Sequence, residues 1–312
     1  MGVNAIEVEH LTRDFKTVLA VDRVNLEIPQ GIIFGFLGPN GAGKTTMIRL
    51  LLGLIEPTGG SARVLGLDIR EEAERIRVRT GALLENTGLY ERLSAEDNLE
   101  FYGRVWRIPG HERRTRTHEL LSRLGLWERR AERVDTWSKG MKQKLALART
   151  LFHRPELIFL DEPTAGLDPV ASATIREDLA NLAANEGITV FLTTHNLSEA
   201  ERLCTRVGVI SRGKLLTVGH PDDLRARSGK ERVEIAGSGF TERTLALLKD
   251  RADVETAERT GDHLVLTLAP GAKTAPIVNL LVREGIEIEE VRKGTASLEE
   301  AFLTIVEEEK ER

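Results

Sequence analysis

Cysteine is almost absent from this chain, since Cys204 is the only one among 312 residues. A single cysteine excludes an internal disulfide and a cysteine-based metal site, and such sparing use favours the cytoplasm. Long apolar runs are absent too, because none approaches the roughly 18 residues that span a bilayer. The stretch 1–6 has neither a charged start nor an apolar core, so we expect no signal peptide.

Basic charge is scarce in the last quarter of the chain. Residues 231–312 hold 11 Lys+Arg and 18 Asp+Glu, a balance of −7, whereas the remainder holds 33 and 31, a balance of +2. This shift predicts a domain boundary near residue 230, and an acidic tail argues against a nucleic-acid arm, which would be basic. With 41% hydrophobic and 30% charged residues, the composition is that of an ordinary globular chain of one or two domains.

A glycine-rich loop is the most specific pattern in the sequence. It has the form G-x-x-x-x-G-K-[ST] and consists of Gly38, Pro39, Asn40, Gly41, Ala42, Gly43, Lys44 and Thr45, with Thr46 directly after it. In such a loop the backbone N–H groups surround a phosphate chain, the lysine contacts the outer phosphates and the hydroxyl ligates Mg²⁺. The apolar run at 32–37 predicts a buried strand before the loop, and 47–52 continues as a helix whose N-terminus faces the anion. This order favours a nucleotide site over a chance glycine-rich turn.

The segments around this loop predict an α/β fold with a mostly parallel core sheet. Uninterrupted apolar strands at 157–160 and 188–192, joined by a helix at about 172–184, are typical of a parallel sheet covered by helices. Alternating segments at 6–11 and 24–28 predict strands of an antiparallel edge sheet.

Two domains are expected. The first, 1–220, contains a helical subdomain at about 86–155, where Leu, Arg and Glu recur at helical spacing, and ends in a hairpin at 207–217. A linker with a helix, 221–230, leads to a small acidic α+β domain, 231–312. In this second domain we expect strands at 233–235 and 264–268, and helices at about 241–250, 274–284 and 297–308.

Polar side chains follow two of the predicted core strands. Asp161 and Glu162 end the first, where Asp161 would hold Mg²⁺ through water or through Thr45 and Glu162 would orient or deprotonate the attacking water. His195 follows the second strand and can donate a hydrogen bond to a γ-phosphate, because ligands of parallel sheets bind at the carboxyl ends of strands. The alternatives are solvated acids at a capped strand end and a purely structural histidine.

The stretch 137–141, Trp-Ser-Lys-Gly-Met, precedes a predicted helix. A hydroxyl, a glycine N–H and a helix N-terminus form an anion site, although a serine here can also be an ordinary N-cap. The ordered set of motifs resembles the nucleotide-binding subunit of ATP-binding-cassette (ABC) transporters. Ser138 and Gly140 match the family signature L-S-G-G-Q, whereas Lys139 and Met141 depart from it. The resemblance implies that Ser138 and Gly140 complete the ATP pocket of a second copy.

Three further positions match the family. The stretch 165–168, ending in Asp168, is similar to its D-loop. Phe15 stands where the family has an aromatic, usually Tyr, that stacks on adenine; stacking needs only a π-face, and the alternative is a core phenylalanine. Glu85 stands where the family usually has a Gln that reaches Mg²⁺ and the membrane partner. A carboxylate can also ligate Mg²⁺, but it adds negative charge near the triphosphate.

The resemblance covers about residues 4–220 and implies a P-loop NTPase fold of the ABC type. The stretches 89–99 and 297–303 resemble the drug- and lipid-exporting, ABC-2-like branch, whose ATPases carry a C-terminal extension. It therefore implies an ATP- and Mg²⁺-dependent ATPase that dimerises around ATP, as a homodimer, with Lys44, Glu162 and His195 as catalytic groups. Such a subunit lies at the cytoplasmic face of the membrane and drives a separate permease, most commonly for export.

Two other functions are open. A soluble ABC ATPase acting on ribosomes or nucleic acid is the alternative, but such proteins usually carry two cassettes or long coiled coils, and this chain has one cassette and no sustained heptads. The arginine-rich stretch 104–116 lacks interleaved aromatic residues, so we expect a solvated helix face and no nucleic acid. The domain 231–312 could bind an effector, cap the ATPase domain or stabilise the dimer, and we favour the dimer contact.

Overall fold

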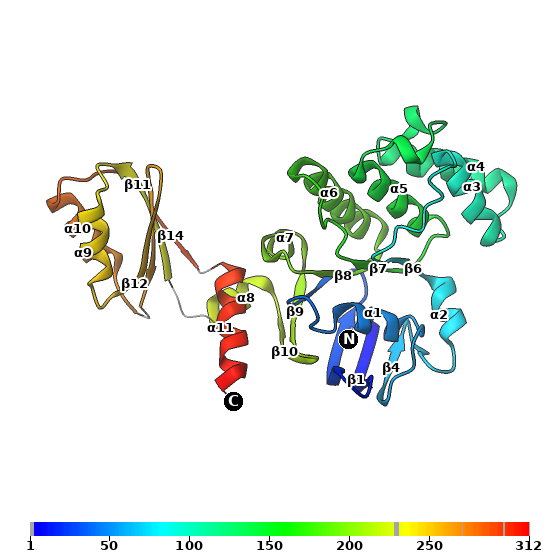
Figure 1. Cartoon of the computed structure of the whole chain (residues 1–312), viewed down its shortest axis with the longest axis horizontal. Coiled ribbons are helices and arrows are strands. Elements are labelled where there is room, and N and C mark those ends of the chain that lie inside the picture. The colour runs from blue at the N-terminus through cyan, green and yellow to red at the C-terminus, as the bar shows by residue number, and fades with distance from the viewer. Residues whose placement is uncertain (1–2, 228–230, 270, 296, 312) are drawn as a thin grey trace. The chain divides into compact units, whose positions relative to one another are not determined.

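The computed structural model describes residues 3–227, 231–269, 271–295 and 297–311. The chain divides into two compact units, Met1–Gly219 and His220–Arg312, each with an apolar core of its own (Figure 1). Within the described ranges, no helix has both the length and the apolar composition that crossing a bilayer requires.

A six-stranded sheet forms the centre of the first unit. Its strand order is β10-β9-β3-β8-β7-β6, and all neighbours are parallel except the hairpin partners β9 and β10. The strands are β3 (Ile33–Leu37), β6 (Thr80–Leu83), β7 (Leu157–Asp161), β8 (Thr189–Thr194), β9 (Arg206–Ser211) and β10 (Lys214–Gly219). Strands β3, β7 and β8 are buried along their whole length, as a sheet with helices on both faces requires. The predicted mostly parallel core sheet is confirmed.

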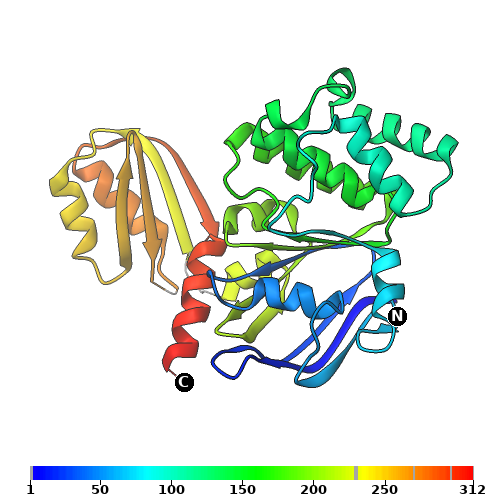
Figure 2. The ribbon, with the colours of Figure 1, turned by 45° about the vertical axis from the view of Figure 1, so that its right-hand side comes forward.

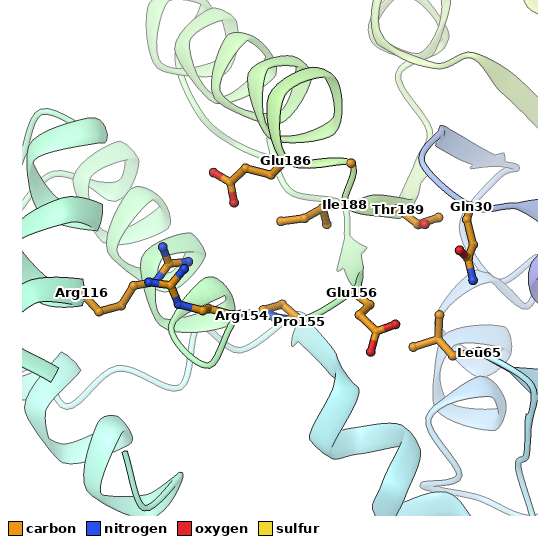
Figure 3. Close-up of a pocket in the computed structure, with 10 residues that line it drawn as sticks. Gln30, Leu65, Arg116, Arg154, Pro155, Glu156, Glu186, Ile188 and Thr189 are labelled. Carbon is orange, nitrogen blue, oxygen red and sulfur yellow. The ribbon is translucent and has the colours of Figure 1, made fainter. Parts of the chain in front are cut away.

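The amino-terminal ends of β7 and β8 line a cavity of about 340 Å³ (Figure 3). The charged groups of its lining already pair with other protein groups. Arg116 Nη1 donates to Glu119 Oε1 over 2.6 Å, and Glu156 accepts two hydrogen bonds of 2.7 Å from Arg79. Because ligands of parallel sheets bind at the carboxyl ends of the strands, the candidate functional site lies at the opposite edge of this sheet.

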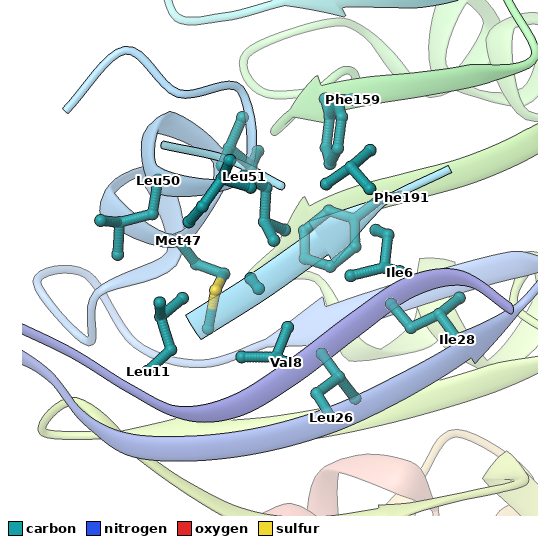
Figure 4. Packing of buried hydrophobic residues seen from close by; sticks show 14 of the residues in the cluster. Ile6, Val8, Leu11, Leu26, Ile28, Met47, Leu50, Leu51, Phe159 and Phe191 are labelled. Carbon is teal, nitrogen blue, oxygen red and sulfur yellow. The ribbon is translucent and has the colours of Figure 1, made fainter. Parts of the chain in front are cut away.

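An antiparallel sheet packs below the parallel one, with α1 between them (Figure 2). Its order is β2-β1-β4-β5, and its strands are β1 (Asn4–Asp14), β2 (Leu19–Pro29), β4 (Gly59–Val64) and β5 (Leu67–Asp68). Helix α1 (Lys44–Leu51) contributes Met47, Leu50 and Leu51 to the core that joins the two sheets (Figure 4). Burial on both sides of α1 fixes the position of the glycine-rich loop that precedes it.

Helices cover the other face of the parallel sheet, those within residues 86–155 among them (Figure 2). The helices of this unit are α2 (Ala73–Arg79), α3 (Ala95–Val105), α4 (Gly110–Arg123), α5 (Lys139–Leu151), α6 (Pro169–Glu186) and α7 (Leu197–Leu203), with the short 3₁₀ turns η1 (Trp127–Arg129) and η2 (Val134–Thr136). Helix α6 begins earlier than the expected residue 172, because Asp168 caps it and a proline occupies its first position.

The second unit has a βαββαβ order that gives a four-stranded antiparallel sheet with order β12-β13-β11-β14, the ferredoxin-like arrangement. Its elements are β11 (Glu231–Ser238), α9 (Glu242–Lys249), β12 (Val254–Thr260), β13 (His263–Leu268), α10 (Thr274–Arg283) and β14 (Glu287–Thr295). Two more helices, α8 (Pro221–Arg227) and α11 (Leu298–Glu311), pack against each other. The expected linker 221–230 is thus a helix over 221–227 that belongs to this unit, and 228–230 lie outside the described residues.

Candidate functional site

The glycine-rich loop connects β3 to α1 and is held tightly from behind. A Cβ added at Gly38 would lie 2.4 Å from the Ile210 carbonyl oxygen, and one added at Gly43 would lie 2.2 Å from that of Ala20. Gly43 has a φ of 106° and caps α1 without a side-chain hydrogen bond, so the first N–H groups of the helix face the loop without a capping side chain. Gly41, with a φ of 78°, has open space where its side chain would be. The loop is therefore packed on one side and open on the other.

Lys44 is the first residue of α1, and only 6% of its surface is exposed. Its ammonium donates hydrogen bonds to the carbonyl oxygens of Gly38 (2.7 Å) and Pro39 (3.2 Å) and lies 3.2 Å from Glu162 Oε1. The loop carbonyls and the glutamate thus direct this charge into the curve of the loop.

Asp161 ends β7 and receives hydroxyl groups on both oxygens. Thr45 Oγ1 donates to Oδ2 over 2.7 Å, and Thr193 Oγ1, from the end of the neighbouring strand β8, donates to Oδ1 over 2.5 Å. The pair of Thr45 hydroxyl and Asp161 carboxylate was expected from the sequence, and these are oxygen ligands of the kind that Mg²⁺ prefers. The residues present therefore fit a hard divalent cation beside the loop.

Glu162 follows directly and has a φ of 50°, a left-handed conformation that is uncommon for a residue with a side chain. Its N–H is held by the carbonyl and hydroxyl oxygens of Thr193, both at 3.1 Å. The Glu162 carboxylate lies between Lys44, at Oε1, and His195, whose Nδ1 is 2.9 Å from Oε2. The fold thus brings together the three groups that the sequence nominates as catalytic.

A cleft of about 560 Å³ opens in front of these carboxylates. Its lining includes Thr45, Asp161 and Glu162 from the core, Glu85 from the segment after β6, and side chains of α5. Glu85 is exposed, so its carboxylate is free to turn into this cleft. The two acids expected to ligate the metal therefore line one cavity.

Phe15 lies in a turn in which its N–H donates to the Val18 carbonyl over 3.0 Å. The ring is 43% exposed, so the alternative of a core phenylalanine is excluded. The Arg13 guanidinium stands 4.3 Å from the ring centroid, which leaves the other face open to a base. The turn leads into β2, where the Ala20 carbonyl touches Gly43 of the loop.

Ser138 and Gly140 lie at the start of α5. Ser138 is the N-cap, accepting from the Met141 N–H over 3.3 Å, as the alternative interpretation expected. Gly140 allows a close approach of α6, because a Cβ there would lie 2.9 Å from that of Ala171. Asp168 likewise caps α6, accepting from the Ala171 N–H over 2.9 Å. Among the described residues that line the cleft, neither Ser138 nor Gly140 is found.

Sequence reasoning missed a buried carboxylate behind the site. Glu199, 2% exposed, accepts hydrogen bonds from the hydroxyls of Thr164 (2.8 and 2.9 Å) and Thr194 (3.0 Å). It thereby joins the segment after Glu162 to the end of β8. The signal for it is the set of threonines after β7 and at the end of β8, followed by the first acid of the short helix α7.

A glycine-rich loop between the first parallel strand and its helix, with paired carboxylates at the end of another parallel strand, defines a P-loop nucleoside triphosphatase. Residues 21–165 match the family described as ABC transporter, and residues 219–306 match the C-terminal domain of DrrA1-3-like ATP-binding proteins. The bacitracin transport ATP-binding protein BcrA of Bacillus licheniformis is 36% identical over 301 residues, which are 96% of this chain and 97% of that protein. The chain belongs to the ATP-binding proteins of ABC transporters, a family of ATPases coupled to transport.

Other similar proteins are longer or shorter. The probable multidrug ABC transporter ATP-binding protein YbhF of Escherichia coli (strain K12) is 40% identical over 230 residues, 74% of this chain, and the match spans only 39% of YbhF. The dimeric ATP-binding cassette MJ0796, solved in a post-hydrolysis state with ADP and Pi, superposes with a TM-score of 0.63 and 27% identity, covering 69% of this chain and 98% of that one. These matches agree with an ATPase domain followed by a separate second unit.

Proposed function

We propose that this chain is the ATP-hydrolysing subunit of an exporter, that it dimerises around ATP and that it drives a separate membrane permease. The observation that carries the proposal is the contact of Glu162 with both Lys44 and His195, beside the pair formed by Thr45 and Asp161. A charge for phosphates, an oxygen pair for a cation and a carboxylate for water are the groups that phosphoryl transfer requires. Coupling to transport is supported by the name of BcrA, which describes bacitracin transport, and export by the name of the 35% identical DrrA3 of Streptomyces coeruleorubidus, which describes daunorubicin resistance.

The loop 38–46 would hold the triphosphate through its backbone N–H groups and Lys44. Thr45 and Asp161 would hold Mg²⁺, with Glu85 as a further oxygen ligand from across the cleft, and the ion when bound neutralises charge that develops on the phosphate oxygens. Glu162 would accept the proton of the attacking water. His195 would donate to the γ-phosphate, since its exposed ring is anchored through Nδ1 and keeps Nε2 for another partner.

A second copy of the chain would complete the site. Ser138 is exposed at the N-terminus of α5 and lies outside the lining of its own cleft, so an anion at this helix end has to come from elsewhere. Gly140 and Asp168 lie beside it at the tips of α5 and α6. ATP between two copies would then hold the dimer together and hydrolysis would release it. The dimeric state of the similar cassette MJ0796 supports this assembly.

An apolar surface on the helical subdomain suits the permease. Tyr90, Leu93, Phe101 and Val105 are 37–60% exposed, and the rings of Tyr90 and Phe101 meet at 4.7 Å. Next to them in sequence is Glu91 of the cleft lining, which would connect a docked permease to the nucleotide. Such a partner places the chain at the cytoplasmic face of the membrane as a peripheral subunit.

The alternative of a nucleic-acid-directed ATPase finds less support. In the arginine-rich stretch, Arg104 and Arg113 share Glu100, and Arg116 pairs with Glu119, so part of this positive charge is already engaged within the protein. For the second unit we favour a dimer contact, in which the exposed Leu303 of α11 would take part.

The decisive variant is Glu162→Gln, which keeps the size of the side chain but removes the base. We expect ATP binding to persist, turnover to fall by orders of magnitude and a dimer to accumulate when ATP is added, measured by light scattering. Glu112→Gln, on an exposed position of α4, is the matched control and should behave as the parent. Hydrolysis by Glu162→Gln at the parent rate would refute the assignment of Glu162.

A further inference from the structure

Lys139 is one of the positions at which the 137–141 stretch departs from the signature of its family, and its side chain has a hydrogen-bond partner in the structure. Its Nζ donates a hydrogen bond of 2.9 Å to the carbonyl oxygen of Ala165, 26 residues further along the chain. Among the described residues, no carboxylate lies within ion-pair distance of this ammonium. The charge is therefore directed at the backbone of the segment that follows Glu162.

Gln143, one helical turn after Lys139, makes the same kind of contact. Its Nε2 donates over 2.7 Å to the carbonyl oxygen of Pro163. Residues four apart lie on one face of a helix, so both side chains reach the same segment from α5. Two points of attachment fix the orientation of a short segment as well as its distance.

The carbonyl groups of this segment are used alternately. Those of Glu162 and Thr164 accept from the N–H groups of residues 165 and 167 over 3.1 and 3.2 Å, which closes two local turns. Those of Pro163 and Ala165 accept the hydrogen bonds from Gln143 and Lys139 of α5. Because backbone carbonyls require hydrogen-bond partners, removing a donor on α5 takes away one of the hydrogen bonds that position this segment.

Gly166 shows that the contact with Lys139 is closely fitted. Its φ is 67°, and a Cβ built on it would lie 2.4 Å from Lys139 Nζ. An alanine there would both strain the backbone and displace the ammonium from its carbonyl. The lysine on α5 and the glycine on the segment therefore match each other.

The same segment carries Glu162, whose left-handed backbone must be held by its surroundings. On the far side Thr164 is anchored to Glu199; on the near side the two α5 donors are the attachment. We propose that Lys139 and Gln143 are positioning residues that set the place of the Glu162 carboxylate and make it follow movements of α5. The inference rests on the proposed role of Glu162 in hydrolysis.

Three variants test the proposal in the full chain. Lys139→Met, at an exposed position, should lower ATP turnover about tenfold, because small misplacements of a catalytic group have large effects on rate, and should change the dissociation constant for ATP less than twofold. Lys139→Arg should restore most of the rate, since it keeps a donor of similar reach. Lys144→Met is the matched control, because this lysine of α5 donates to the Leu124 carbonyl, away from the segment, and should turn over ATP as the parent does.

Gly166→Ala disturbs the contact between Lys139 and Ala165 from the segment that follows Glu162. It should slow turnover as Lys139→Met does, and the double variant should be no slower than the single ones, because both remove one interaction. Amide hydrogen exchange over 163–167 should quicken in each, and the thermal unfolding midpoint should be unchanged in Lys139→Met.

The proposal is overturned if Lys139→Met hydrolyses ATP at the parent rate while Glu162→Gln is inactive. It is also overturned if arginine does not restore the rate and the two variants are additive, since the charge would then act elsewhere. A parent chain without ATPase activity would instead refute the proposed function.

Discussion

Thr193 offers a test of how the carboxylates are held. Its hydroxyl is fully buried, donates to Asp161 Oδ1 over 2.5 Å and accepts from the Glu162 N–H over 3.1 Å. Thr193→Val keeps the shape but removes both hydrogen bonds. A hydrogen bond to a charged group contributes about 1.5–3 kcal/mol, and Glu162 N–H keeps the Thr193 carbonyl, so we expect the free energy of unfolding to fall by about 2 kcal/mol.

Unfolding of the full chain by heat is the assay, and a loss of about 2 kcal/mol corresponds to a fall of roughly 4–8 °C in the midpoint for a unit of this size. Turnover should fall as well, because Asp161 then depends on Thr45 alone. The matched control is Thr189→Val at the other end of β8, where a buried hydroxyl accepts from the neutral Gly31 N–H over 2.9 Å. It should lose less stability and keep its hydrolysis. Equal midpoints for the parent and Thr193→Val would refute the reasoning.

Three further predictions concern the base, the metal and pH. Arg13→Gln should weaken ATP binding about two- to fivefold, as expected for a cation stacked on an exposed ring such as Phe15. The affinity for inorganic tripolyphosphate, measured by titration calorimetry, should be unchanged. Equal losses of affinity for both ligands would place Arg13 at the phosphates. Glu85→Ala should raise the Mg²⁺ concentration for half-maximal turnover, whereas an unchanged Mg²⁺ dependence would exclude it as a ligand. The Arg113 guanidinium lowers the pKa of Glu100 from 4.5 to about 2, so this contact stabilises the fold above pH 4.5 and its contribution is lost as pH falls to about 2. The unfolding midpoints of the parent and of Glu100→Gln should therefore differ at pH 7 and converge near pH 2. A difference that stays constant with pH would contradict the assignment.

The phosphate loop and the carboxylate strand were predictable because their chemistry is local. Gly38 and Gly43 belong to one contiguous motif that the sequence shows directly, although the carbonyl oxygens that approach them come from Ile210 and Ala20. A buried strand that ends in Asp161 and Glu162 is visible as an apolar run. The contact of Thr193 with Asp161 was not predicted, because it depends on the register that pairs these two residues across β7 and β8, and neither segment encodes that register.

Two strands with a weak apolar pattern, β12 and β4, were not predicted either. Strand β12 buries only Val254 and Ala257 of its seven residues, and β4 begins with two glycines, so neither has the alternation that marks a strand. Strand β4 is paired with the distant β1, and β12 forms a hairpin with β13, so pairing rather than their own residue pattern makes them strands. The contact of Lys139 with Ala165 could not be predicted from the sequence either, since 26 residues separate the two.

The central claim is that each ATP site is built from two copies, and mixing two inactive variants tests it most directly. Lys44→Ala removes the positive charge that contacts the phosphates. Ser138→Asp keeps a residue type that caps helices but places a negative charge against the triphosphate of the other copy. Alone, each should be inactive. Mixed in equal amounts they should regain about a quarter of the parent ATPase rate, because half of the dimers are mixed and one of their two symmetric sites is intact. No recovery on mixing would contradict the shared site.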